Sequence, residues 1–199
     1  YALHTLPDIP VGHFATCPVM ILAASDRVEI KIHGDGGHAA MPHLSVDPVL
    51  ISGHIIVSLQ PIISRRTNPM QSAVISITNS VSGTGAHNVI PDSAWLYGTV
   101  RLSDSKMRPE IERQIRRLSE DIAANYGGRA EIKYTTGFEA TVNSGAETDH
   151  AVSAARTVTD IDQVYGNYPA TLGGEDFGAM LEQKPGCYMY IGQGEPEIP

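Results

Sequence analysis

Apolar and polar residues alternate in four stretches of this 199-residue chain, and each stretch predicts a β-strand. The four are RVEIKIH (27–33), SAVISITNS (72–80), AWLYGTVRL (94–102) and RAEIKYTT (129–136). In the first of them Val28, Ile30 and Ile32 would share one face, while charged residues occupy the other. This pattern is typical of a strand that is buried on one side only.

Two segments between these strands have helical patterns. Asp47-Pro48 is a typical helix start, and the apolar residues after it predict a helix to about Ser64. Pro61 should bend or end this helix early, because proline lacks an amide hydrogen and crowds the preceding turn. A second helix is predicted by apolar residues spaced 4-4-3-4-4, and Gly127-Gly128 should end it. Its apolar stripe consists of Met107, Ile111, Ile115, Leu118, Ile122 and Tyr126.

The predicted order is therefore β-α-β-β-α-β over residues 26–136, which is the ferredoxin-like arrangement. Residues 1–25 should hold at most one strand and a loop. Residues 137–199 should hold a helix near 147–158, a second helix after GGED and a short strand, CYMYIG. We interpret the two flanks as pieces of one α/β domain, into which the α+β unit is inserted.

Composition and charge exclude several classes of protein. A net charge of −8 argues against nucleic-acid binding, which needs clustered lysine and arginine. The longest apolar run, 49–59, is too short to span a bilayer, and the first residues do not resemble a secretory signal. Two cysteines suit a reducing cytoplasm. The chain lacks an initial methionine and stops in turn-like residues, so both ends are expected to be cut.

The segment HGDGGHAAMPH (33–43) carries the most suggestive chemistry. It has no Lys-Ser/Thr for a phosphate loop, and the chain contains neither a G-x-S-x-G elbow nor an H-E-x-x-H zinc motif. His33 and His43 are most simply exposed or backbone-bonded histidines. His38 lies between glycines and alanines at a strand exit, so from chemistry alone it is equally well a functional or an incidental residue.

Three other residues are candidates only in combination. Asn88 lies in a glycine-flanked loop, and Arg101 follows thirteen residues later near the end of a predicted strand. Together an amide and a guanidinium could bind a carboxylate, although each is also explained as a turn residue or a surface charge. His4, near the N-terminus, is unremarkable by itself.

Taken together, these segments resemble the zinc-type aminoacylase and carboxypeptidase metallopeptidases, in the amidohydrolase branch that contains hippurate hydrolases and auxin-conjugate hydrolases. The matching stretches occur along almost the whole chain in the family's order. They are ALHTLPDIPVG, FAT, IHGDGGHAAMPHLSVDPV, SLQPIISR, NVIPD, GTVR, GGEDF and PGCYMYIGQGE. The resemblance implies a metal-dependent amidohydrolase of N-acyl amino acids, built from a catalytic domain (1–25 and 137–199) and an inserted lid (26–136) that dimerises.

The resemblance also implies roles for the four candidates. His4 matches a metal ligand, and His38 matches a lid histidine that stabilises the oxyanion, often across the dimer. Asn88 and Arg101 match lid residues that hold the substrate and its carboxylate. The cofactor would be a divalent metal pair of zinc, manganese, cobalt or nickel, and the substrate a small N-acyl amino acid.

The family's other metal ligands would lie before His4 and beyond Pro199, so we expect a central segment that by itself lacks the metal and activity. One alternative is a non-catalytic ferredoxin-like module for dimerisation or small-molecule binding. Another is an inactive relative that keeps the fold.

Overall fold

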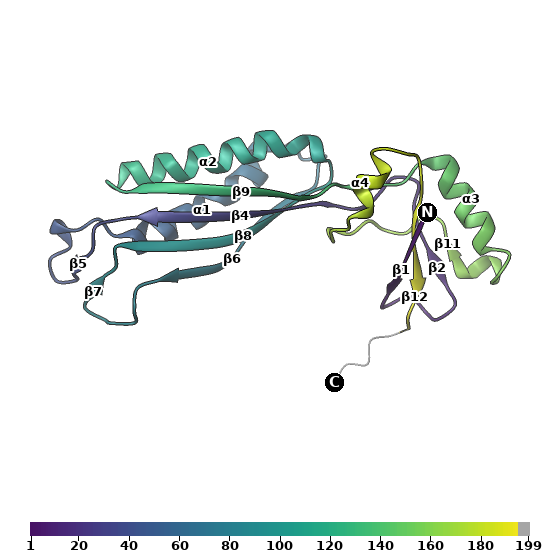
Figure 1. Cartoon of the computed structure of the whole chain (residues 1–199), viewed down its shortest axis with the longest axis horizontal. Helices are drawn as coiled ribbons and strands as arrows, with labels where there is room; N and C mark the ends of the chain where they lie inside the picture. The colour runs from purple at the N-terminus through teal and green to yellow at the C-terminus, as the bar shows by residue number, and fades with distance from the viewer. Residues whose placement is uncertain (195–199) are drawn as a thin grey trace. The chain divides into compact units, whose positions relative to one another are not determined.

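The computed structural model describes residues 1–194, and the chain divides into two compact units (Figure 1). The inserted unit is Ser25–Gly137, and the flanking unit combines Tyr1–Ala24 with Phe138–Pro199. Both units contain sheets and helices, which confirms the predicted mixed fold class. Among the described residues no helix has the length and apolar character needed to cross a membrane.

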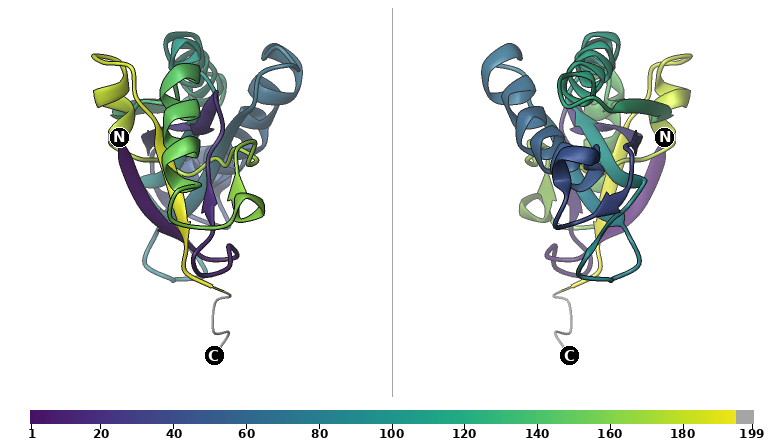
Figure 2. Two further views of the ribbon diagram at one scale, coloured as in Figure 1. Left: turned by 90° about the vertical axis from the view of Figure 1, so that its right-hand side faces the viewer. Right: turned by 90° about the vertical axis from the view of Figure 1, so that its left-hand side faces the viewer.

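The inserted unit is an antiparallel sheet with two long helices on one face (Figures 1 and 2). Its sheet has the order β6-β8-β4-β9, so the predicted β-α-β-β-α-β succession is confirmed. Its main elements are β4 (Ala24–His33), α1 (Pro48–Arg66), β6 (Ala73–Ser82), β8 (Ser93–Leu102), α2 (Arg108–Asn125) and β9 (Arg129–Phe138). Short elements join them: β5 (Gly37–His38), η1 (Pro42–Leu44), β7 (Val89–Ile90) and η2 (Ser105–Met107).

The core of the inserted unit follows the sequence pattern. Val28, Ile30 and Ile32 of β4 are buried, as the alternation predicts, and alternate residues of β8 are buried with them. The helices contribute their apolar stripes, for example Ile55 of α1 and Ile115 of α2. The Asp47 side chain accepts hydrogen bonds from the amides of residues 49 and 50, which caps α1 as predicted.

The prediction that Pro61 ends this helix early is wrong. Helix α1 continues through Pro61 to Arg66. Both Pro61 and Val57, whose carbonyl loses a hydrogen bond to the missing amide, are exposed. Because water can satisfy that carbonyl, the proline costs the helix less than it would in a buried turn.

Asp26 anchors the inserted unit where the chain enters and leaves it. Its buried carboxylate accepts hydrogen bonds from Arg108 Nε (2.8 Å), the Tyr134 hydroxyl (2.7 Å) and the Gly137 amide (3.0 Å). Burial, followed by the hydrogen bond to Asp26, raises the pKa of Tyr134 far above its usual value. The network joins the first strand of the unit to α2 and to the last strand.

The flanking unit is built on a second sheet with the order β1-β12-β2-β11. Its elements are β1 (Ala2–Leu6), β2 (Phe14–Ala15), β3 (Met20–Leu22), β10 (Thr141–Val142), α3 (Gly145–Ala155), η3 (Ile161–Gln163), β11 (Val164–Tyr165), α4 (Phe177–Leu181) and β12 (Tyr188–Gly192). The expectation of at most one strand in residues 1–25 is wrong, since three strands form there before β4. Strands β2 and β3 span only two and three residues, too few to show an alternation, and distant partners hold them in place.

Asn143 joins the two parts of the flanking unit. Its buried amide donates to Thr16 Oγ1 (3.1 Å) and to the carbonyls of Cys17 and Tyr188 (both 2.9 Å), and its oxygen accepts from the Tyr188 amide (2.7 Å). Cys17 and Cys187 are both buried and unpaired. Burial raises the pKa of the Cys17 thiol, so this residue is a poor nucleophile.

Candidate functional site

The segment 33–43 leaves β4 and forms a tip with the loop before β8. Gly37 and His38 pair with Ile90 and Val89 in a two-stranded antiparallel ladder, β5–β7. The Ala39 amide also donates to the Asn88 carbonyl (3.0 Å). The structure therefore brings His38 and Asn88 together, although they are fifty positions apart in the sequence. We call this part, residues 34–46 and 83–92, the tip.

Two features hold the tip against the end of the sheet. Asp92 accepts a hydrogen bond from the Gly36 amide on its side chain (3.0 Å) and one from the Gly34 amide on its carbonyl (2.8 Å). A side chain at Gly34 would overlap the Val46 carbonyl, and one at Gly36 would overlap the Asp92 carboxylate. The glycines of the motif are needed for this close approach rather than for binding a phosphate.

The hydrogen bond at Nδ1 determines what the exposed His38 ring can do. This nitrogen lies 3.1 Å from the Ala40 amide, which can only donate, so Nδ1 must supply its lone pair. The neutral ring then carries its proton on Nε2, which leaves an N–H donor free to meet a negatively charged oxygen. Within the described residues the Asn88 side chain has no hydrogen-bond partner, so it is also available to a ligand.

His4 of β1 has the opposite arrangement. Its exposed ring places Nδ1 2.6 Å from the Thr5 carbonyl oxygen, which can only accept. The proton therefore lies on Nδ1, and Nε2 presents a lone pair of the kind that a divalent metal binds. Such second hydrogen bonds from Nδ1 to a carbonyl are typical of histidine ligands.

Arg101 lies far from the tip within its own chain. It is opposite Val74 near the end of β8, and β8 starts directly after the tip. Because a strand rises about 3.3 Å per residue, the nine steps of β8 separate its ends by about 30 Å. The sequence suggests that Arg101 and Asn88 could bind one carboxylate together. Within one chain they lie too far apart to do so. Arg101 has no ion pair within residues 1–194.

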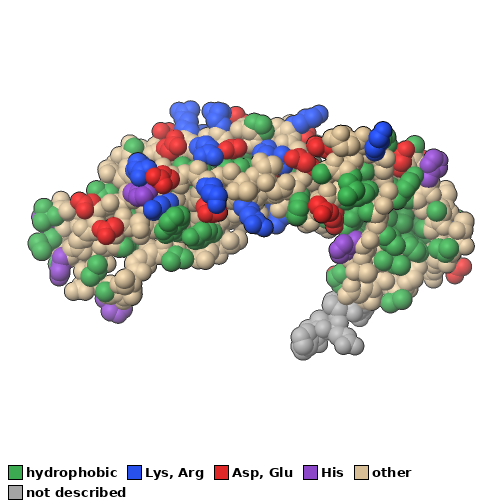
Figure 3. All heavy atoms as spheres, in the orientation of Figure 1, with side chains coloured by type: hydrophobic (Ala, Val, Ile, Leu, Met, Phe, Trp, Pro, Cys, Tyr) green, Lys and Arg blue, Asp and Glu red, His purple; other side chains and the backbone are tan. Residues whose placement is uncertain are grey.

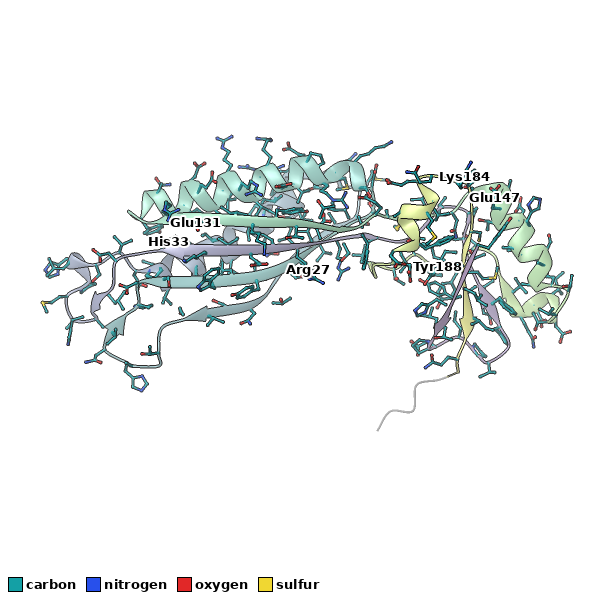
Figure 4. The ribbon with its side chains drawn as sticks, in the orientation of Figure 1. Arg27, His33, Glu131, Glu147, Lys184 and Tyr188 are labelled. Carbon is teal, nitrogen blue, oxygen red and sulfur yellow. The ribbon has the colours of Figure 1, made fainter. Side chains whose placement is uncertain are left out.

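His33 and His43 are not among the candidate site residues. Nε2 of His33 lies 3.4 Å from Oε2 of Glu131, so His33 joins β4 to β9 (Figure 4). The pKa of Glu131 is lowered by its hydrogen bonds, first to Arg129 and then to His33. His43 is exposed in η1.

Sequence reasoning missed a polar group in the flanking unit. The buried Tyr188 ring (labelled in Figure 4) stacks against His4 with centroids 6.4 Å apart. Its hydroxyl donates to Glu175 (3.0 Å). Burial of Glu175 would raise its pKa, but hydrogen bonds from Asp176 and Tyr188 outweigh burial and lower it. The hydrogen bond to Glu175 raises the pKa of Asp176. The sequence places GGEDF at a predicted helix start and among the stretches that resemble the family, but no spacing links it to His4.

The described residues do not complete a metal centre. Within residues 1–194 no group of three or more histidine, cysteine, aspartate or glutamate side chains could hold a metal ion. His4 fits as one donor, but a catalytic divalent metal needs about three protein ligands. The side chains of residues 1–194 therefore provide too few ligands to bind a catalytic metal by themselves.

Comparison with known proteins identifies the family. Residues 24–127, about half of the chain, match the family model described as the peptidase dimerisation domain of the M20 peptidases. The chain belongs to the M20 peptidase family. Its tip, His38 and Arg101 all lie in this M20 dimerisation domain, whereas His4 lies outside it.

Relatives extend the match to the M20 flanking unit. The chain is 38% identical over 197 residues to N-acetylcysteine deacetylase of Bacillus subtilis, which covers 99% of this chain and 51% of the relative. It is 36% identical over 196 residues to thermostable carboxypeptidase 2 of Saccharolobus solfataricus, covering 96% of this chain and 48% of the relative. This M20 chain therefore spans about half the length of the curated relatives it matches.

A solved structure of the family agrees with the fold. The YXEP protein of Bacillus subtilis, described as a dinuclear metal binding peptidase from the M20 family, is 33% identical with a TM-score of 0.74. The match covers 96% of this chain and 46% of that one.

Proposed function

We propose that this chain is part of a metal-dependent amidohydrolase that cleaves the amide bond of N-acyl amino acids, including hippurate-like substrates. The observation that carries the proposal is 38% identity to an N-acetylcysteine deacetylase over nearly the whole chain. A carboxypeptidase is similar at 36%. Both kinds of enzyme cleave an amide whose nitrogen belongs to an amino acid, and this shared chemistry supports the substrate class.

The proposed roles follow from the free groups described above. Nε2 of His4 would be one ligand of a divalent metal pair completed by residues outside the 199. When bound, such a pair activates water and polarises the amide carbonyl. The Nε2–H of His38 would donate to the oxyanion, and Asn88 would orient the scissile amide beside it. The Arg101 guanidinium would hold the carboxylate of the substrate by a bidentate pair.

The separation of Arg101 from the tip supports a site shared between two subunits. We propose a homodimer through the inserted unit, in which His38 and Asn88 act at the active site of the partner and His4 and Arg101 act at their own. The metal identity is left open among zinc, manganese, cobalt and nickel, because imidazole and carboxylate ligands accept all four. Two buried free cysteines support a reducing cytoplasmic location.

Subunit mixing tests this proposal. In a protein of the relatives' length, H4A and H38A would each be inactive toward N-acetylcysteine and hippurate. After the two are unfolded and refolded together in equal amounts, half of the dimers are mixed, and each has one intact site. Activity should return to about a quarter of wild type. If no activity returns, the shared site is refuted. If the wild-type protein hydrolyses neither substrate with any of the four metals, the proposed amidohydrolase activity is refuted.

A second candidate function is a non-catalytic dimerisation module. The description of the matched family model, which covers the inserted unit, favours it. It predicts a dimer that has no turnover in the protein of full length, so the same assay separates the two candidates.

A further inference from the structure

The inserted unit contains a polar pocket where α1 ends and α2 begins. Its volume is about 210 Å³, which is room for about seven water molecules at about 30 Å³ each. Arg66 and the loop after α1 line one side, and residues spaced i, i+3, i+4 and i+7 along η2 and α2 line the other. The residues with this spacing are Met107, Glu110, Ile111 and Gln114. The pocket contains none of the four candidate site residues.

Gln114 brings an unpaired acceptor to this pocket. The residue is almost completely buried, with 7% of its surface exposed. Its Nε2 donates to Oε1 of Glu110 (2.7 Å), which fixes the orientation of the amide. The Oε1 atom of Gln114 is buried and, within residues 1–194, accepts no hydrogen bond. Because buried acceptors are normally paired, this oxygen calls for a donor that the described part of the chain does not supply.

The positive charges at the pocket are also unpaired. Elsewhere along α2 arginine side chains lie beside acidic ones, as the mixture of charges over this helix shows (Figure 3). Arg113, for example, pairs with Glu110 (2.7 Å). The side chains of Arg66 and Lys106, which line the pocket, have no hydrogen bond or ion pair with any other described residue. Two free cations beside one pocket are suited to binding an anionic group.

Glu110 adds a negative charge to the pocket. The hydrogen bond from Arg113 lowers the pKa of this carboxyl group, so it is ionised at neutral pH. The buried side chains of Met107 and Ile111 add apolar surface. A ligand that matches all of these groups must carry a positively charged donor, a negative charge and a small apolar part.

We propose that this pocket binds a free α-amino acid with a small apolar side chain. The ammonium group of the ligand donates to Oε1 of Gln114 and to the Glu110 carboxylate, and its carboxylate binds Arg66 and Lys106. A simple anion such as phosphate would leave Oε1 of Gln114 unpaired and would approach the like charge of Glu110. A water molecule would satisfy Oε1 but neither cation. The inference goes beyond the proposed hydrolysis and does not depend on it.

Occupation of the pocket would join the end of α1 to the start of α2. Arg108, which follows Met107 at this start, donates to Asp26 (2.8 Å), where the chain enters the inserted unit. A ligand that binds only the folded chain raises its stability. The Tm of the chain should therefore rise with the concentration of the amino acid.

Isothermal titration calorimetry of the 199-residue chain with L-valine tests the class of ligand. Valine should bind saturably, with one molecule per chain. Two analogues are the controls, because isovalerate lacks the amino group and isobutylamine lacks the carboxylate. Each should bind at least about tenfold more weakly than valine, since each leaves charged partners in the pocket without a counterpart.

The other outcomes overturn the proposal in different ways. If valine shows no saturable binding up to about 10 mM, the site does not exist. Isovalerate or inorganic phosphate that binds as tightly as valine would make the pocket a simple anion site. Isobutylamine that binds as tightly would exclude the role of the two cations. None of these measurements involves hydrolysis, so each of these results leaves the proposed function standing.

Variants test the location of the site. R66A and K106A should each raise the Kd for valine about tenfold. The matched control R65A removes the neighbouring exposed charge, which does not line the pocket, and should leave Kd unchanged. Q114M keeps a long side chain without the acceptor oxygen and should raise Kd at least about fivefold, with circular dichroism to show that it is folded. An equal loss in R65A and R66A, or an unchanged Kd in both K106A and Q114M, would place valine elsewhere and overturn the pocket.

Discussion

His4 and His38 lie in different units and use the same ring atom in opposite ways. In the flanking unit, Nδ1 of His4 donates to a backbone carbonyl, which frees the lone pair of Nε2. At the tip of the inserted unit, Nδ1 of His38 accepts from a backbone amide, which leaves a proton on Nε2. One ring is prepared to bind a cation and the other to donate to an anion.

This difference is set by backbone groups rather than by neighbouring side chains. Thr5 and Ala40 contribute a carbonyl and an amide, so substitution of their side chains would leave both hydrogen bonds in place. The local chain path therefore decides which role each histidine can take. Two identical residues become chemically distinct because His4 lies within β1, whereas His38 is the last residue of β5 and precedes a turn.

Replacement of His4 should have the largest effect. In a protein of the relatives' length, H4A should lose at least one metal ion per subunit and reduce turnover to background, because a ligand cannot be replaced by solvent without loss of affinity. Metal analysis and hydrolysis of N-acetylcysteine would measure this. H150A, an exposed histidine of the same unit, is the control and should keep both. Retention of full metal content by H4A would refute its role.

Replacement of His38 should have the next largest effect. H38A should lower kcat by about 10²–10³, as expected for loss of an oxyanion donor, and should change metal content little. H38Q places an amide N–H donor at about the same reach as the ring Nε2 and should recover part of the loss. H43A, in the same loop, should behave as wild type. A kcat for H38A within a few-fold of wild type would contradict the oxyanion role.

Arg101 should affect binding more than turnover. R101A should raise KM by about 10- to 100-fold for substrates with a free carboxylate, since a hydrogen-bonded charge pair contributes about 1.5–3 kcal/mol. The test compares an N-acyl amino acid with its methyl ester. The KM for the ester should be the same in R101A and in wild type. An equal loss on both substrates would exclude carboxylate binding by Arg101.

The strands and helices with strong periodicity could be predicted from the sequence. Alternation located β4, β6, β8 and β9, and the apolar stripe located α2, because these elements bury one face and expose the other. The N-cap Asp47 was also predictable, since capping is a local interaction. Strands β2 and β3 could not be, because their pairing depends on residues more than a hundred positions away.

For the candidate site, sequence could name residues but could not position them. Resemblance to the family selected His4, His38, Asn88 and Arg101, and their roles stay predictions. That His38 and Asn88 meet, while Arg101 lies at the far end of β8, follows from the β5–β7 ladder. This ladder has two residues per strand and leaves no periodic signal. The two tautomers depend on single backbone hydrogen bonds, which no residue pattern encodes.

Asp92 should have the smallest effect, and it tests how firmly the tip must be held. Its carboxylate accepts from the Gly36 amide (3.0 Å) and has no proposed contact with substrate. Loss of this hydrogen bond in D92A should hold His38 less firmly and raise the free-energy barrier of the reaction by about 1 kcal/mol. This corresponds to a kcat that is about five-fold lower, while KM changes less. D92N keeps an acceptor oxygen and should recover most of the activity. The matched control is Asp104, which accepts from the Lys106 amide (2.9 Å) on η2, after β8, so D104A should leave kcat unchanged. If D92A and D104A behave alike, the tip does not depend on this hydrogen bond, and the glycine contacts alone position His38.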